Sequence, residues 1–246
     1  MIKSLICSMG LCLVIPNAQA AISYLYDGRG TPDEQGWTRY SGAGHLGGTS
    51  EVSLVPGGGF EAETDGMAFN SYAIDTGYAE FMVSARIRMT HAQYNFADAG
   101  LMFSVLGQPN QPDRFSGFFL TPDQVGFMDL TDMAPVTAEQ YHDYTVLYRD
   151  NALSFFLDDS FDDIMSGVAM PELYRLDPIP SIFGNRSGVV QIGDWTNDLN
   201  VNSRYRMQSV SFLGITPIPE PGTSLMLSLG LGFLAFSIQK KRFLST

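Results

Sequence analysis

The sequence is 246 residues long, which is room for one sizeable domain or two small ones. Both cysteines, Cys7 and Cys12, stand near the N-terminus, so the rest of the chain forms no disulfide and offers no thiol for catalysis or zinc binding. From Ala21 to Glu220 the strong cations are ten arginines, against 26 acidic residues, which leaves a net charge of about −16. A surface this negative makes nucleic acid a poor partner.

The first segment has the pattern of a secretory signal peptide. Lys3 supplies a positive charge, an apolar run covers Leu5–Ile15, and Ala18 and Ala20 occupy the two small-residue positions that signal peptidase recognises. The alternative, a buried core helix, would have to bury this whole run without any polar face. We therefore predict export, with cleavage by signal peptidase before Ala21.

A glycine-rich stretch follows in the mature chain. Residues 42–47 are Gly-Ala-Gly-His-Leu-Gly, which matches the dinucleotide-binding fingerprint letter for letter. That fingerprint works only between a strand and a helix whose N-terminus holds a pyrophosphate. Because a β-like run follows Gly47 instead of a helix, we interpret the stretch as a flexible glycine loop.

Three carboxylates alternate at Glu61, Glu63 and Asp65. On a strand they would all point to one face. Pairs of carboxylates on one face are how glycosidases hold an acid and a nucleophile close together. The same pattern also fits a solvated face at a sheet edge, which we favour because no tryptophan stands nearby as a platform for a sugar.

The body from Ile22 to Ile215 has no convincing helical period, and several segments have the period of two that is typical of strands. The alternation is clearest at Phe81–Met89. Tyr144–Tyr148 and Leu153–Leu157 flank a polar turn, which predicts a hairpin. Val168–Pro180 carries three prolines and is expected to be a long loop. Further strand candidates are Gly100–Leu106, Phe115–Leu120, Val125–Leu130, Gly188–Ile192 and Tyr205–Leu213.

Many short strands separated by turn signals predict an all-β fold, an antiparallel β-sandwich, rather than a parallel α/β fold. The order of features resembles a concanavalin A-like (laminin-G-like) jelly roll at Ser84–Arg88, Gly100–Phe103, Phe156–Asp159 and Ile192–Asp194. The resemblance implies that the hairpin forms two adjacent strands and that the Gly-Asp pair begins a loop near the rim. Some glucanases of this kind carry Glu-x-Asp-x-Glu on a strand, whereas residues 61–65 are Glu-x-Glu-x-Asp.

A dense acidic turn follows the hairpin at Asp158, Asp159, Asp162 and Asp163. Calcium takes six to eight oxygen ligands, and loops at sandwich rims commonly supply them. The spacing is not that of an EF-hand loop, because no glycine turn and no closing glutamate fit it. Two interpretations stay open, a calcium site and a solvated acidic loop, and calcium is the one cofactor that the sequence suggests.

The histidines and tryptophans are spread along the body. His45, His91 and His142 are far apart in sequence and show no ligand spacing, so we do not expect a histidine metal site. Trp37 and Trp195 could stack on sugar rings, as the aromatic residues of binding modules do, or could fill the core of the sandwich.

The C-terminal residues form a tripartite tail. Its parts are, in order, Pro219-Glu220-Pro221, an uncharged apolar run over Gly222–Ile238, and the basic cluster Lys240-Lys241-Arg242. The prolines stop a helix from extending backwards, so the motif should be extended and accessible. The apolar run is just long enough to span a membrane as a single helix, and the cations favour a cytoplasmic C-terminus.

Pro-Glu-Pro, a short membrane helix and a basic tip in this order resemble the PEP-CTERM sorting signal. The resemblance implies that a membrane-embedded exosortase recognises Pro219, Glu220 and Pro221, removes the helix, and passes the protein to the cell surface or the extracellular matrix. It also implies a Gram-negative bacterium that makes exopolysaccharide. A plain tail anchor that stays in the inner membrane is the alternative.

Together these patterns predict a signal peptide over residues 1–20, a β-sandwich domain over 21–216 and a sorting signal over 217–246. For the domain we favour a non-catalytic module that binds matrix polysaccharide or has a structural role in the envelope. The alternative is a secreted glycan hydrolase that uses Glu61, Glu63 or Asp65.

Overall fold

The computed structural model describes residues 22–93, 101–105, 116–127, 133–137, 139–150, 152–168, 174–176, 188–194 and 201–217. These ranges contain thirteen strands, one 3-10 helix and one short α-helix. The elements are β1 (Ser23–Tyr26), η1 (Pro32–Gln35), β2 (Thr38–Leu54), β3 (Phe60–Asp75), β4 (Tyr78–Ala92), β5 (Leu101–Val105), β6 (Ser116–Leu120), β7 (Gln124–Phe127), β8 (Met133–Pro135), β9 (His142–Arg149), β10 (Ala152–Leu157), α1 (Phe161–Ser166), β11 (Tyr174–Leu176), β12 (Val189–Asp194) and β13 (Ser203–Pro217).

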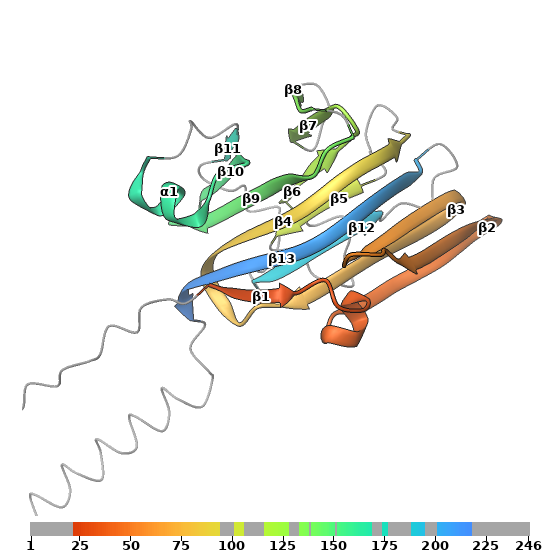
Figure 1. Cartoon of the computed structure of the whole chain (residues 1–246), viewed down its shortest axis with the longest axis horizontal. Helices are drawn as coiled ribbons and strands as arrows, with labels where there is room; N and C mark the ends of the chain where they lie inside the picture. The colour runs from red at the N-terminus through yellow and green to blue at the C-terminus, as the bar shows by residue number, and fades with distance from the viewer. Residues whose placement is uncertain are drawn as a thin grey trace, which may run out of the picture.

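The strands form one antiparallel sheet that folds back on itself into two layers. Its order is β11-β10-β9-β4-β13-β3-β12-β5-β6-β7-β8, with β1 beside β13 and β2 beside β3. Figure 1 shows β4 and β13 in front of β12, β5 and β6. We call β11, β10, β9, β4 and β13 the front layer, and β12 and β5 to β8 the back layer.

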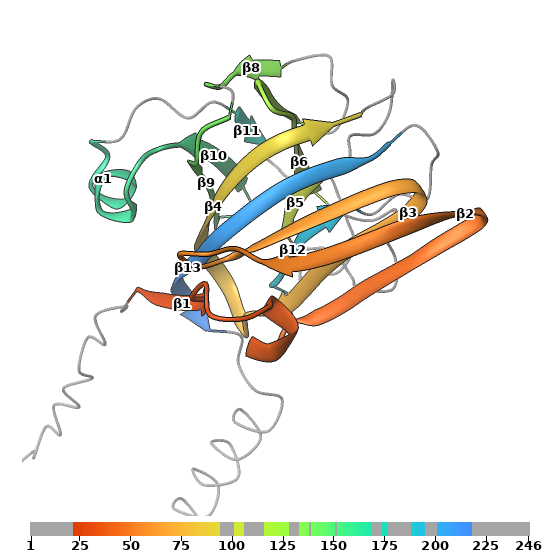
Figure 2. The same cartoon turned by 45° about the vertical axis from the view of Figure 1, so that its right-hand side comes forward.

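The ribbon of β2 and β3 belongs to both layers. The first half of β3 pairs with β13 of the front layer, and its second half pairs with β12 of the back layer. Between the halves of β3 the pairing with β2 has a register shift, between Ala43 and Gly48. Both strands bend back at this point, as Figure 2 shows. Gly66 has a φ of 69° at this bend, and a Cβ on Gly48 would lie 2.4 Å from the carbonyl oxygen of Asp65. Glycine is therefore required where the ribbon passes between the layers.

The core lies between the layers. Alternate residues of β4, from Phe81 to Met89, point inward and are buried. Phe118 of the back layer stacks on Phe155 of the front layer with their ring centroids 4.1 Å apart. Each such aromatic side chain contributes roughly 1.5–3 kcal/mol by leaving water.

The helix α1 packs on the opposite side of the front layer. Ser160 caps it, accepting a hydrogen bond from the backbone N–H of Asp163 at 3.2 Å. Phe161 and Ile164 of the helix are buried in a small second cluster with Met82 and Leu213. This cluster covers one end of a sheet face that is otherwise polar.

The predicted antiparallel β fold is confirmed, and the strand predicted at Phe81–Met89 and the hairpin that follows it in the chain are strands of the front layer. Three expectations differ from the structure. The glycine stretch at residues 42–47 lies within β2 rather than in a free loop, because its backbone pairs with β3 up to the bend. The acidic turn continues into α1, and the expected long loop contains the three-residue strand β11.

The first and last described strands lie side by side. In the pairing of β1 with β13, Ser23 lies opposite Phe212, and the last residue of β13, Pro217, pairs with Tyr78 of β4. Figure 1 shows the start of β1 and the end of β13 at the same end of the sheet. The sheet therefore joins both ends of the described chain at one place.

Candidate functional site

One face of the front layer points away from the core, and we call it the outer face. Its character changes along the strands from apolar, through hydroxyl-bearing, to charged. The apolar residues under α1 are Met82, Leu147 and Leu213; the hydroxyl residues are Ser84, Thr145 and Ser211; the charged residues are Arg86, Arg88, Asp143, Arg204, Arg206, Glu61 and Glu63.

At the charged end, Glu61 of β3 links two arginines of β13. Its Oε1 accepts a hydrogen bond from Nη2 of Arg204 at 2.7 Å, and its Oε2 accepts one from Nε of Arg206 at 2.5 Å. Burial alone would raise the pKa of Glu61, but the hydrogen bonds from Arg206 and Arg204 outweigh it and hold the pKa below its usual value. Glu61 is therefore an ionised carboxylate, and both of its oxygens accept hydrogen bonds from arginine.

A hollow of about 590 Å³ lies beside this ion pair. We call it the arginine hollow, and it is lined by Glu61, Glu63, Arg88, Thr90, His91, Arg204 and Arg206. Arg88 and Arg206 lie directly opposite each other on β4 and β13. Thr90 donates a hydrogen bond to the carbonyl oxygen of Arg204 at 3.0 Å, which holds the two strands together at this point.

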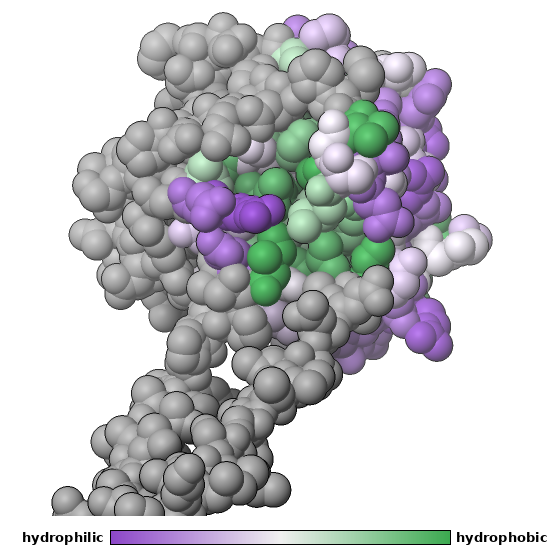
Figure 3. Space-filling view, turned by 90° about the vertical axis from the view of Figure 1, so that its left-hand side faces the viewer, coloured by the Kyte–Doolittle hydropathy of each residue, from purple (hydrophilic) through white to green (hydrophobic). Residues whose placement is uncertain are grey.

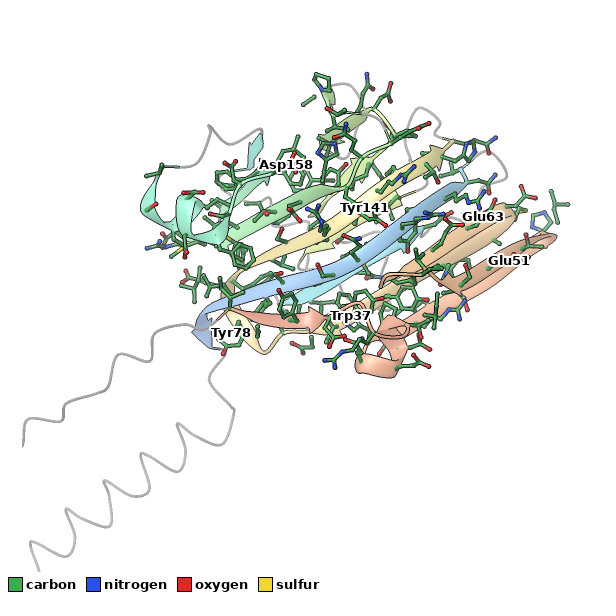
Figure 4. All side chains as sticks on the ribbon, viewed as in Figure 1. Trp37, Glu51, Glu63, Tyr78, Tyr141 and Asp158 are labelled. Carbon is green, nitrogen blue, oxygen red and sulfur yellow. The ribbon has the colours of Figure 1, made fainter. Side chains whose placement is uncertain are left out.

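A second hollow, of about 280 Å³, adjoins the first and shares Glu63 and His91 with it. We call it the acidic hollow, and its other lining residues are Thr49, Glu51, Thr64, Asp65, Gln93 and Asn202. Figure 4 shows Glu51 and Glu63 side by side at the end of the front layer where the ribbon bends. The alternating carboxylates of β3 thus share a face as expected, and Glu63 and Asp65 line this hollow.

The floor of the acidic hollow is fixed by a buried contact between three strands. Thr64 of β3 donates a hydrogen bond to the carboxylate of Asp194, the last residue of β12. The same hydroxyl accepts a hydrogen bond from the backbone N–H of Ser203 at the start of β13, at 3.1 Å. Asp194 is fully buried, and through Thr64 it links the end of β12 to β3 and to the start of β13. Residues 195–200, which follow it, lie outside the described part of the chain, so the expected rim loop stays a prediction.

A third hollow, of about 290 Å³, lies in the hydroxyl-bearing part of the outer face between β1 and α1. Ser84 and Ser211 belong to its lining, together with Tyr24 and Asp159. Tyr24 is 64% exposed, which makes it available for stacking. Figure 3 looks at this end of the molecule, where hydrophobic residues gather between hydrophilic flanks.

Two of the four aspartates of the predicted calcium site, Asp158 and Asp163, form hydrogen bonds with different groups. Asp158 accepts a hydrogen bond from the backbone N–H of Asp143 at 2.9 Å and lies 2.7 Å from Nδ1 of His142. Asp163 accepts a hydrogen bond from the hydroxyl of Ser160 at 2.6 Å. Within the described ranges, no three histidine or acidic side chains come close enough to hold a metal ion. Calcium binding at Asp158, Asp159, Asp162 and Asp163 stays a prediction.

The tryptophans and histidines take different roles. Trp37 is buried and donates a hydrogen bond from Nε1 to the carbonyl oxygen of Leu25 at 2.8 Å, so it fills the core rather than offering a sugar platform. Trp195 lies outside the described residues. Of the three histidines, His91 lines both hollows at the charged end.

Sequence reasoning missed Arg88, Arg204, Arg206, His91 and Tyr24 as lining residues. Alternation places Arg88 on the polar side of its strand, but nothing local brings Arg204 and Arg206 beside Glu61. Those contacts depend on the pairing of β3 with β13, whose residues are about 140 positions apart in the chain.

The sorting signals lie outside the described residues. This holds for the signal peptide with Ala18, Ala20 and Ala21, for Pro219, Glu220 and Pro221, and for the basic tip Lys240, Lys241 and Arg242. Within the part of the chain that the structure describes, no helix is both long and apolar enough to cross a membrane.

Comparison with protein families gives one match, to the PEP-CTERM protein-sorting motif over residues 217–242. The chain therefore carries this motif, which implies export and processing at the membrane by an exosortase. The match begins at Pro217, the last residue of β13, so the sorting signal starts where the sheet ends. No curated protein matches the sequence.

Several solved structures have a similar arrangement of strands. A proposed glycosyl hydrolase from Parabacteroides distasonis is 13% identical, with a TM-score of 0.49 over 79% of this chain and 94% of that one. The β-glucanase of Bacillus licheniformis is 12% identical, with a TM-score of 0.44 over 73% and 92%. Arcelin-5, a lectin-like defence protein from Phaseolus vulgaris, is 9% identical, with a TM-score of 0.41 over 81% and 100%. Similarity at this level says nothing about the ligand or reaction of this chain.

Proposed function

We propose that this protein is an envelope or matrix component of a Gram-negative bacterium whose β-sandwich binds carbohydrate on its outer face without cleaving it. The sorting motif supports this location, since exosortase processing would release the domain to the cell surface or the surrounding exopolysaccharide. Signal peptidase would act first, before Ala21.

The single observation that carries the binding role is the pair of adjoining hollows at the charged end of the outer face. They share Glu63 and His91, so they form one continuous depression over β2, β3, β13 and β4. Guanidinium, carboxylate, imidazole and hydroxyl groups line it, and these are the groups that exchange hydrogen bonds with sugar hydroxyls. A glycan chain fits such an open depression better than a small enclosed ligand does.

The partners of Glu61 favour binding over hydrolysis. A glycosidase needs one carboxylic acid with a raised pKa that protonates the leaving group. Arg204 and Arg206 hold Glu61 ionised and lower its pKa, which is the wrong direction for that acid. Glu63 has a half-exposed side chain and a second ion pair to Arg204 at 3.5 Å.

A glycan hydrolase remains the second candidate because of Glu63 and Asp65. Residues two apart on a strand lie roughly 6.6 Å apart, which falls in the range of inverting glycosidases, about 6.5–9.5 Å. Both carboxylates line the acidic hollow. In this mechanism one of them would be the general acid and the other would activate water.

The test compares binding with turnover. The full chain, purified in mild detergent, is incubated with exopolysaccharide from the producing bacterium and with neutral β-glucan, and co-sedimentation and release of reducing ends are measured. We expect sedimentation without release. Glu63→Ala should weaken binding by about tenfold, since it removes a group common to both hollows. Asp150→Ala, in the turn between β9 and β10, is the control. Release of reducing ends that Glu63→Gln abolishes would overturn the binding role in favour of hydrolysis.

The sorting step has its own test. Replacing Glu220 with Ala should leave an unprocessed protein in the inner-membrane fraction, whereas the wild-type chain appears at the surface with a lower mass. Equal processing of both would contradict recognition of the motif by exosortase.

A further inference from the structure

Arg88 is the arginine that stands without a partner in the arginine hollow. Its Nε is buried and makes no hydrogen bond, and its guanidinium forms no ion pair with any described residue. The other described arginine side chains have polar partners: Arg29 pairs with Asp27, Arg39 bonds Asn70, Arg86 pairs with Asp143, Arg149 pairs with Asp150, and Arg204 and Arg206 pair with Glu61. Among the arginine side chains that the structure describes, Arg88 is thus the one without a polar partner, in a body whose net charge is about −16.

The neighbours of Arg88 make this cation costly. Arg206 lies directly opposite on β13, and like charges at such a cross-strand position repel each other. The nearby carboxylate of Glu61 is already bonded to Arg204 and Arg206. The half-buried guanidinium of Arg88 loses hydration without gaining a counter-charge. An anion that enters the hollow would supply that counter-charge.

We propose that the arginine hollow binds the carboxylate of an acidic sugar, a uronic acid residue of a polysaccharide, through Arg88. The planar fork of a guanidinium donates two parallel hydrogen bonds to a carboxylate, which selects this group over a hydroxyl. The proposal rests on the proposed carbohydrate-binding function and names the class of sugar that this face selects.

The adjoining acidic hollow limits the ligand further. Glu51, Glu63 and Asp65 line it, and Figure 4 shows the first two next to each other. Carboxylates accept hydrogen bonds from the hydroxyls of a neutral sugar, but repel a second uronate. The matching ligand therefore carries an acidic residue flanked by neutral ones, rather than a charge on every sugar.

The experiment measures affinity for xanthan, in which uronic acids stand among neutral sugars, and for xanthan whose carboxyl groups have been reduced to alcohols. The full chain in mild detergent is used. The variant Arg88→Met keeps the apolar stem and removes the charge. Arg149→Met makes the same change at the exposed last residue of β9, at the far end of that strand, and is the matched control. Unfolding temperatures of both variants check that the fold is retained.

We expect the wild type and Arg149→Met to prefer native xanthan over the reduced polymer by about ten- to a hundredfold. In Arg88→Met the preference should disappear while binding of the reduced polymer stays the same. Polygalacturonate, with a charge on every residue, should bind more weakly than xanthan.

Equal affinity of the wild type for native and reduced xanthan would overturn the uronate proposal and leave carbohydrate binding in place. A preference that survives in Arg88→Met would overturn the role of Arg88. Tighter binding of polygalacturonate would overturn the assignment of neutral sugars to the acidic hollow. Binding of neither form of xanthan, or of the bacterium's own exopolysaccharide, would overturn the carbohydrate-binding function itself.

Discussion

At the scale of single residues, Glu61 shows how one carboxylate organises the charged end of the outer face. It bridges Arg204 and Arg206 with only 13% of its side chain exposed. We expect Glu61→Gln to lower the free energy of unfolding at pH 7 by about 1–3 kcal/mol, because two guanidinium groups lose their charged acceptor. For a domain of this size that is a fall in unfolding temperature of about 2–12 °C.

The pH dependence of the same variant follows from the lowered pKa of Glu61. A carboxylate with a depressed pKa adds stability above its unfolded-state pKa of 4.5, and that stability is lost as the pH falls through the folded-state value. Urea unfolding of the wild type and Glu61→Gln should therefore differ at pH 7 and converge in acid. A difference that stays constant down to pH 3 would show that the effect of the substitution is steric rather than ionic.

His142 provides a second residue-scale prediction, with the opposite sign. Burial alone would lower its pKa, but the carboxylate of Asp158 and the carbonyl oxygen of Thr137 outweigh it and raise the pKa above 6.5. A raised histidine pKa adds stability that is fully present below pH 6.5 and is lost as the pH rises through the folded-state value.

The matched variant is Asp158→Asn. Asparagine keeps an oxygen for the backbone N–H of Asp143, and it tolerates the φ of 61° at this position. The unfolding temperature of the wild type, measured from pH 5.5 to 8.5, should fall more steeply with pH than that of the variant. Parallel curves would exclude His142 as the titrating group.

At the scale of elements, the bend in the β2–β3 ribbon depends on close backbone contact. Gly77, in the turn between β3 and β4, is the comparison outside the bend. Gly77→Ala places a Cβ in open space at a φ of 70°, so it should cost about 1–2 kcal/mol of unfolding free energy. Gly48→Ala should cost more, about 2–4 kcal/mol, because its Cβ meets backbone atoms of Asp65 and Ala68 at 2.4 and 2.6 Å. Chemical denaturation of the two variants tests the order, and equal losses would mean that the bend can relax.

The same elements mark what the sequence could predict. Strands with one face in the core, such as β4, alternate apolar and polar residues and were predicted from that pattern. β2 is exposed or half-exposed along its length and is held by pairing with β3, so its glycine-rich sequence carries no alternation. α1 has six residues, too few to show a helical period.

The site was predictable only in part for a related reason. Local spacing put Glu61, Glu63 and Asp65 on one face, and the structure agrees. It could not show that arginines from the last strand in the chain, β13, neutralise Glu61, since that depends on which strands become neighbours. The charge left on Arg88 follows from the same long-range pairing.

At the scale of the whole molecule, the sheet and the sorting tail meet at Pro217. This residue pairs with Tyr78 and is also the first residue of the sorting motif, so removal of the residues after it breaks no described strand pairing. We expect a chain that ends at Pro217 to unfold at the same temperature as the full chain, within about 2 °C, when both are measured in the same detergent by circular dichroism.

A shorter chain that ends at Ser209 is the control, because it loses Val210 and Phe212 from the main core and the partner strand of β1. Burying two large apolar side chains contributes roughly 3–6 kcal/mol, a large share of the stability of an ordinary domain, so this chain should not fold. If it were instead the chain ending at Pro217 that lost stability, the tail would have to contact the sandwich. Exosortase cleavage would then lower the stability of the domain that it releases, in addition to changing the location of the domain.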